Sequence, residues 1–126
     1  MINQIGKITL YVNNQAEAKS FWLDKMNFVV KLEQPMGPNM TWLEVGPSAD
    51  AFTSFVLYEK QLMLAQRPDA NVACPNIILS TKDIAATYEQ LKQNGVKVGE
   101  LQIMPYGKMF SFEDQDGNTV LIREDL

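Results

Sequence analysis

The chain has 126 residues, with 15 acidic and 11 basic side chains and a formal net charge of -4. Its single cysteine and lack of histidine exclude an internal disulfide, a Ser-His-Asp triad and a histidine-based zinc site. The acidic balance argues against nucleic-acid binding, and no apolar run approaches the ~20 residues of a membrane span. The first residues lack the basic start and apolar stretch of a signal peptide. We therefore expect a cytoplasmic protein with a small-molecule or protein partner.

The first half of the chain predicts a strand, a helix and three further strands. Ile8, Leu10 and Val12 alternate with less apolar neighbours, which is the period of a half-buried strand. Asn14 can cap the helix that follows, and Asn27 can end it in a left-handed conformation. The predicted strands are 6–12, 28–32, 40–45 and 52–59, the predicted helix is 15–25, and residues 60–75 are a connection.

The second half repeats the same order of elements. Asp83 can cap a helix that places Ile84, Tyr88 and Leu91 on one face, and Gly95 suits the left-handed end of that helix. The predicted strands are 76–80, 96–98, 108–113 and 119–124, with a hairpin turn at 114–118. Neither half can bury both its helix and its sheet alone, so we expect the halves to pair, within one chain or between two chains.

Short motifs in both halves resemble those of a known family. They are Tyr11-Val12-Asn13-Asn14, Phe21-Trp22, Met26-Asn27-Phe28, Asp83-Ile84, Asn94-Gly95-Val96 and Asp114-Gln115-Asp116-Gly117-Asn118. In order and spacing they resemble the vicinal oxygen chelate superfamily, which includes glyoxalase I, extradiol dioxygenases and bleomycin-resistance proteins. The resemblance implies one α+β domain over 1–126. Its two βαβββ modules, at about 5–60 and 75–124, would form a curved, mixed sheet of eight strands.

The resemblance also implies a cup in which catalytic members hold a divalent metal. The four ligand positions of the family fall on Lys7, Tyr58 (with Glu59 beside it), Asn76 and Leu121. An ammonium, a phenol, an amide and an aliphatic side chain cannot replace two imidazoles and two carboxylates around a metal ion. We therefore expect neither a metal nor another cofactor.

Strand alternation predicts which side chains line this cup. The predicted ligand-binding residues are Lys7, Thr9, Tyr11, Trp42, Glu44, Tyr58, Asn76, Ile78, Leu121 and Arg123. An aromatic ring at Trp42 beside the carboxylate of Glu44 suits a flat, cationic ligand. Trp42 packed in a dimer seam is the alternative interpretation.

The function predicted from these features is metal-free binding or sequestration of a small organic, antibiotic-like molecule by a homodimer. One alternative is a glyoxalase-like lyase or other enzyme of the superfamily in which Lys7 or Glu59 acts as acid or base. Against this, Lys7 can simply pair with Glu44 or Glu59, and the usual metal ligands are missing. Another alternative is a non-catalytic regulatory or interaction subunit.

Overall fold

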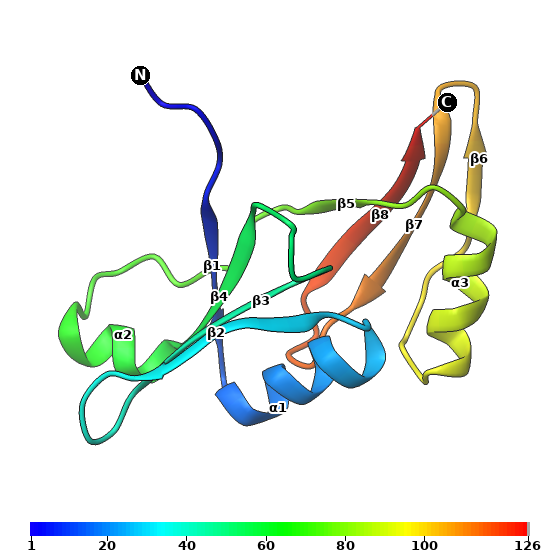
Figure 1. Ribbon diagram of the computed structural model, residues 1–126. Coiled ribbons are helices and arrows are strands. Elements are labelled where there is room, and N and C mark those ends of the chain that lie inside the picture. The colour runs from blue at the N-terminus through cyan, green and yellow to red at the C-terminus, as the bar shows by residue number, and fades with distance from the viewer. Residues whose placement is uncertain (126) are drawn as a thin grey trace. The chain divides into compact units, whose positions relative to one another are not determined.

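The computed structural model describes residues 1–125, which fall into two compact units. The first unit is Met1–Cys74, and the second begins at Pro75. Each unit is an α+β module with its own four-stranded mixed sheet, and the two are described separately below (Figure 1). None of the helices within residues 1–125 is long and apolar enough to cross a membrane.

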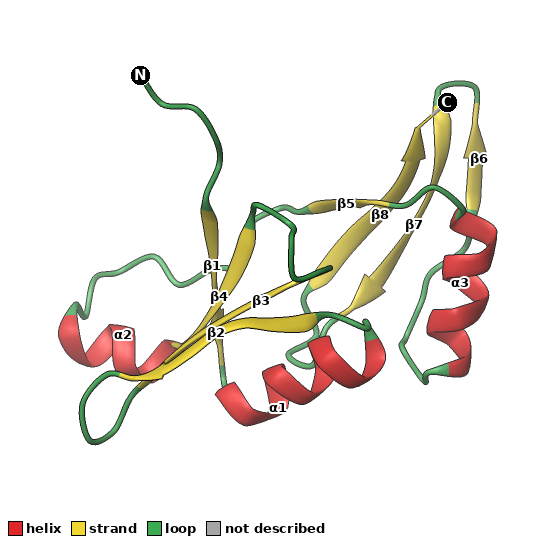
Figure 2. Ribbon diagram, in the orientation of Figure 1, coloured by secondary structure: helices red, strands yellow, loops and turns green. Residues whose placement is uncertain are grey.

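The first unit follows the predicted order of strand, helix and three strands (Figure 2). Its sheet has the order β1-β4-β3-β2, with β1 parallel to β4 and the other neighbours antiparallel. The elements are β1 (Lys7–Val12), α1 (Gln15–Ser20), a π-helical turn η1 (Phe21–Lys25), β2 (Val29–Pro35), β3 (Thr41–Gly46), β4 (Ser54–Glu59) and α2 (Lys60–Gln66).

Two asparagines mark the ends of the first helical segment, as the sequence predicted. The Asn14 side chain accepts a hydrogen bond of 2.9 Å from the backbone N–H of Glu17, which satisfies one of the free donors at the start of α1. Asn27 has a φ of 58°, the left-handed conformation that ends the segment after η1. Local side-chain chemistry therefore determines the bounds of this segment.

An aromatic cluster joins the helical segment to one side of this sheet. Trp22 has 0% of its surface exposed, and its ring centroid lies 5.2 Å from that of Phe55 on β4 and 4.9 Å from that of Phe28. Leu10 and Val12 of β1 are buried as well. Most of the hydrophobic core of the unit lies on this side of the sheet, whereas Val56 and Tyr58 are buried on the other side.

The second unit repeats the arrangement, with the sheet order β5-β8-β7-β6. Asp83 caps its helix by accepting a hydrogen bond from the N–H of Ala86, and Gly95 follows the helix with a φ of 83°. The Tyr88 ring packs edge-on against Phe110 at 4.9 Å. The elements are β5 (Ile78–Ser80), α3 (Ile84–Gln93), β6 (Gln102–Met104), β7 (Gly107–Glu113) and β8 (Thr119–Asp125).

The structure differs from the predicted elements at two places. Residues 60–66 form helix α2 instead of part of a connection. The predicted strand at 96–98 is wrong: Val98 makes one isolated bridge to Phe112, and β6 forms later, where a two-residue loop folds it onto β7. Strand pairing in residues 1–125 occurs only within each unit, so the eight strands form two sheets of four.

Candidate functional site

One side of the first sheet carries the side chains predicted for the cup. Phe55 packs against Trp22 on the core side, so its neighbour Val56 points to the opposite side. Residues paired in register share a side, and the pairing of β1, β3 and β4 therefore determines which side chains accompany Val56. We call this set the cup face: Lys7, Thr9, Tyr11, Trp42, Glu44, Ser54, Val56 and Tyr58. It includes all six predicted cup residues of this unit.

A buried carboxylate lies at the centre of the cup face. Glu44 is only 4% exposed, and its two oxygens accept hydrogen bonds of 2.9 Å from Lys7 Nζ and 2.8 Å from Trp42 Nε1. Burial raises the pKa of Glu44, but the bonds from Trp42 and Lys7, the Lys7 charge and a bond from Ser54 outweigh it and lower the pKa below its usual value. Glu44 is therefore ionised at neutral pH, and Lys7 pairs with it and not with Glu59.

Three aromatic rings on the cup face contact one another. Tyr58 lies between Tyr11, at 5.9 Å between centroids, and Trp42, at 6.5 Å, and both contacts are edge-on. The Tyr58 hydroxyl accepts a hydrogen bond of 2.8 Å from Gln66 Nε2 on α2. The helix that the sequence did not predict therefore orients the central ring of this aromatic group.

The register separates two of the positions at which the family holds a metal. Lys7 lies opposite Ser54, whereas Tyr58 lies opposite Tyr11. The two positions are four residues apart along parallel strands, or roughly 13 Å, so Lys7 and Tyr58 do not converge on one point. Residues 1–125 contain no group of three or more carboxylate, thiol or imidazole side chains placed to share a metal ion.

The second unit has a corresponding face with different chemistry. Ile78 pairs in register with Leu121, and Arg123 lies two residues further along β8, on the same side of the sheet. The Arg123 guanidinium is occupied by the Asp125 carboxylate at 2.6 Å and by the Tyr106 carbonyl at 3.1 Å. Asn76 is exposed and lies before β5, outside the strand in which it was predicted. This face is therefore more aliphatic than the cup face of the first unit.

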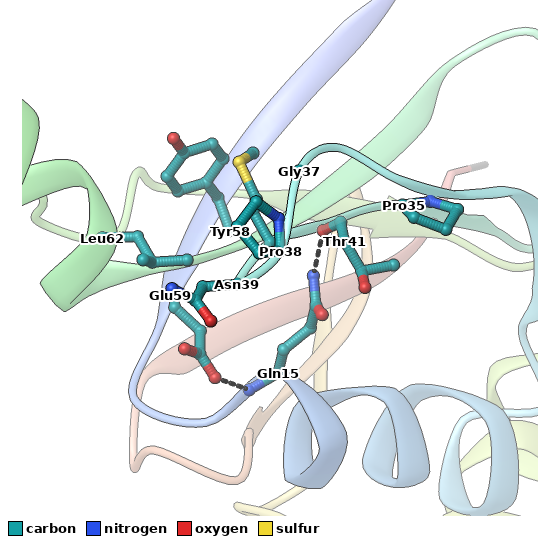
Figure 3. A pocket seen from close by; sticks show the side chains of 10 residues that line it. Gln15, Pro35, Gly37, Pro38, Asn39, Thr41, Tyr58, Glu59 and Leu62 are labelled. Atoms are coloured by element: carbon teal, nitrogen blue, oxygen red, sulfur yellow. Dashed lines mark hydrogen bonds between the residues drawn. The ribbon is translucent and has the colours of Figure 1, made fainter.

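A pocket of about 400 Å³ at the end of β4 was not predicted (Figure 3). Its lining residues are Gln15, Pro35, Gly37, Pro38, Asn39, Met40, Thr41, Tyr58, Glu59 and Leu62. The Gln15 side chain supports the pocket by donating from Nε2 to the carbonyls of Thr41 and Leu57, both at 2.8 Å. The Gln15 backbone N–H donates to Glu59 Oε2 at 3.0 Å. The contacts that shape this pocket join distant parts of the chain, so no local pattern in the sequence predicts them.

Comparison with known proteins identifies the family. A family model described as the Glyoxalase/Bleomycin resistance protein/Dioxygenase superfamily matches residues 4–122. The chain belongs to this superfamily. The resemblance deduced from the motifs is therefore confirmed, and so is the fold of two βαβββ modules.

Known members of the superfamily match along almost the whole chain. The Bacillus subtilis (strain 168) protein YetH is 40% identical over 125 residues, which cover 98% of this chain and 100% of YetH. The crystal structure of TnmS3, an antibiotic binding protein from Streptomyces sp. CB03234, has a TM-score of 0.82 at 27% identity, covering 99% of this chain and 98% of TnmS3. A superfamily member from Sphaerobacter thermophilus DSM 20745 has a TM-score of 0.81 at 25% identity, covering 98% of both chains.

Proposed function

We propose that the protein binds a small, flat organic molecule of an antibiotic-like kind on the cup face, without a metal and without transforming it. The observation that carries the proposal is the group of three aromatic rings, Tyr11, Trp42 and Tyr58, of which Tyr11 and Trp42 are partly exposed, beside the ion pair of Lys7 and Glu44. The similarity to TnmS3, which is an antibiotic binding protein, supports the same class of ligand.

The hydrogen bonds of the cup face favour a rigid binding surface. The indole N–H of Trp42 donates to Glu44, so the Trp42 ring is held in one orientation before any ligand arrives. A side chain that is already ordered loses less conformational entropy on binding. Tyr58 is held in the same way by Gln66. Ligand rings can then stack on Trp42 and Tyr11, which are both partly exposed.

The charge of the cup face changes the class of ligand that we expect. The sequence suggested that Glu44 would attract a cationic ligand. In the structure each Glu44 oxygen already accepts a hydrogen bond, and the Lys7 ammonium neutralises its charge. Lys7 keeps 53% of its side chain exposed, so the polar group that the face offers to a ligand is a donor. A neutral aromatic ligand with a carbonyl or hydroxyl oxygen near Lys7 suits this surface best.

The alternative of acid–base catalysis by Lys7 or Glu59 has less support, and the structure places the two too far apart to work together. Lys7 begins β1, and Glu59 ends β4, where it lies opposite Val12 at the other end of the parallel pair. The two residues are five rows apart, or roughly 16 Å along the strands, so they cannot act on the same bond. Considered without Glu59, Lys7 is ion-paired with Glu44. Among residues 1–125 no other proton acceptor is bonded to its ammonium group.

Binding can be tested with a panel of neutral and cationic aromatic antibiotics in a thermal-shift assay. We expect neutral aromatic members to raise the melting temperature of the wild type, because a ligand that binds only the native state stabilises it. Trp42→Ala should abolish that shift. Tyr106→Ala, which removes an exposed ring from the second unit, is the matched control and should keep it. Equal shifts in the two variants would contradict the proposal.

We also propose that the protein is a homodimer. Strands β1 and β2 are the edges of the first sheet, and β5 and β6 are the edges of the second. Edge strands expose backbone groups that another chain can pair with or cover. Light scattering on the purified protein should give twice the mass of the chain, and a monomer mass at micromolar concentration would contradict this.

A further inference from the structure

We propose that the pocket at the end of β4 is a binding site for a protonated small amine, with the ammonium group on Glu59 and an aliphatic tail against the apolar lining. The pocket shares only Tyr58 with the cup face, so this inference does not depend on the proposed function. It assigns a separate role to Glu59, which no other part of the proposed function uses.

The Glu59 carboxylate provides the negative charge of the pocket. Glu59 is the last residue of β4 and is partly buried where it lines the pocket. Its Oε2 accepts a hydrogen bond of 3.0 Å from the Gln15 N–H. Its other oxygen accepts none from any residue of 1–125, and no lysine or arginine of that range forms an ion pair with Glu59. A partly buried, uncompensated carboxylate attracts a cation.

Gln15 also lines the pocket, with its backbone N–H bonded to Glu59 and its side-chain amide bonded to Thr41 (Figure 3). Both hydrogens of its amide group are used, by the carbonyls of Thr41 and Leu57. Its amide oxygen is the remaining polar atom and can only accept. Glu59 and Gln15, two residues of the pocket lining, therefore each have an oxygen that can accept a further hydrogen bond, which suits an ammonium group with three donors.

The pocket lining disfavours anions and divalent metal ions. No lysine or arginine belongs to the pocket lining, so an anion would find no countercharge there. Calcium takes six to eight oxygen ligands and magnesium demands octahedral geometry, whereas this lining has a single carboxylate. An organic monocation is the ligand class that a single carboxylate with an amide acceptor can balance.

Several apolar side chains also line the pocket. Pro35, Pro38, Met40 and Leu62 contribute aliphatic or thioether surface, and Tyr58 adds a ring. The volume of about 400 Å³ lies at the lower end of the range for small-molecule sites. Methionine adapts its shape to different partners, so the lining can accept alkyl chains of several lengths. We therefore expect a primary amine with a short alkyl chain to fit.

The test uses n-hexylamine hydrochloride as probe and backbone amide shifts of the ¹⁵N-labelled full chain as readout, at neutral pH. We expect saturable shifts for the amides of Gln15, Asn39 and Glu59. Hexan-1-ol, which has the same chain without the charge, should bind about tenfold more weakly, and hexanoate should not bind. Hexanoate binding as tightly as hexylamine, or no saturable shift with hexylamine, would overturn the proposal.

Variants then assign the effect to the carboxylate. Glu59→Gln keeps an acceptor for the Gln15 N–H but removes the charge, and should weaken hexylamine binding about tenfold. Asn39→Lys places a competing ammonium in the pocket from an exposed loop, so it should also weaken binding even if Glu59→Gln folds poorly. Glu100→Gln makes the same charge change at an exposed residue of the second unit and should leave the affinity within about twofold.

Trp42→Ala separates this proposal from the proposed function. It should remove antibiotic-induced stabilisation while hexylamine binding stays within about twofold of the wild type, because Trp42 does not line the pocket. Unchanged hexylamine affinity in both Glu59→Gln and Asn39→Lys would show that the amine binds elsewhere and would overturn the assignment.

Discussion

Replacing Glu44 by glutamine tests the account of the ion pair between the buried Glu44 and the half-exposed Lys7 on the cup face. Glutamine has almost the same shape but no charge, so Lys7 loses its countercharge and Trp42 keeps a neutral acceptor. A hydrogen bond to a charged group contributes about 1.5–3 kcal/mol, but Lys7 is half exposed, which reduces its share to that of a surface pair. We therefore expect the free energy of unfolding at pH 7 to fall by about 1–2 kcal/mol.

The pH dependence of this loss is the decisive measurement. The pKa of Glu44 in the folded protein lies below its usual value of 4.5, so its ionised form stabilises the folded state. That stabilisation is complete above the unfolded-state pKa and is lost as the pH falls through the folded-state pKa. Urea denaturation should therefore show the difference between wild type and Glu44→Gln shrinking as the pH falls below 4.5.

Glu33→Gln serves as the control for this experiment, because it breaks the exposed pair with Lys19 and should change stability by less than about 0.5 kcal/mol. A Glu44→Gln loss that is equally large at pH 7 and at low pH would refute the reasoning, since the residue would then act through packing and not through its charge. No loss at pH 7 would refute it as well.

Two further predictions concern the stability of the first unit. Trp22→Ala should lower the free energy of unfolding by about 3–5 kcal/mol in urea denaturation, because the ring is fully buried against Phe28 and Phe55; a loss below 1 kcal/mol would contradict this packing. Asn27→Ala should cost about 1 kcal/mol and Asn27→Gly close to nothing, because the φ of 58° suits glycine and strains alanine. Equal losses in the two Asn27 variants would speak against a left-handed helix end.

Features that depend on neighbouring residues were predictable from the sequence. Asn14 and Asp83 cap their helices through N–H groups three residues further on, so the signal lies in one short stretch. The side of β1 that carries Lys7 followed from alternation alone. Helix α2 was missed although every residue in it is a good helix former, because seven residues are too few to show a helical period.

The arrangement of the candidate site could be predicted only in part. Lys7 and Glu44 are 37 positions apart, and the sequence offered Glu59 as an equally suitable partner. The register of β1 with β4 places Glu59 at the far end of the strand pair from Lys7, and the register of β3 with β4 brings Glu44 close to Lys7. The pocket depends on Gln15 bonds that reach 26 and 42 residues along the chain. Such contacts have no local pattern, because they depend on which strands become neighbours.

The parallel pairing within each sheet has a consequence for how the chain is made. Lys7 pairs with Ser54, and Ile78 pairs with Leu121, so the strand synthesised first in each unit waits for the strand synthesised last. That last strand, β4 or β8, lies inside its sheet and not at an edge. During synthesis neither sheet can close until its final strand has left the ribosome, and a nascent chain that stops short of β8 leaves β5 and β7 without their common neighbour.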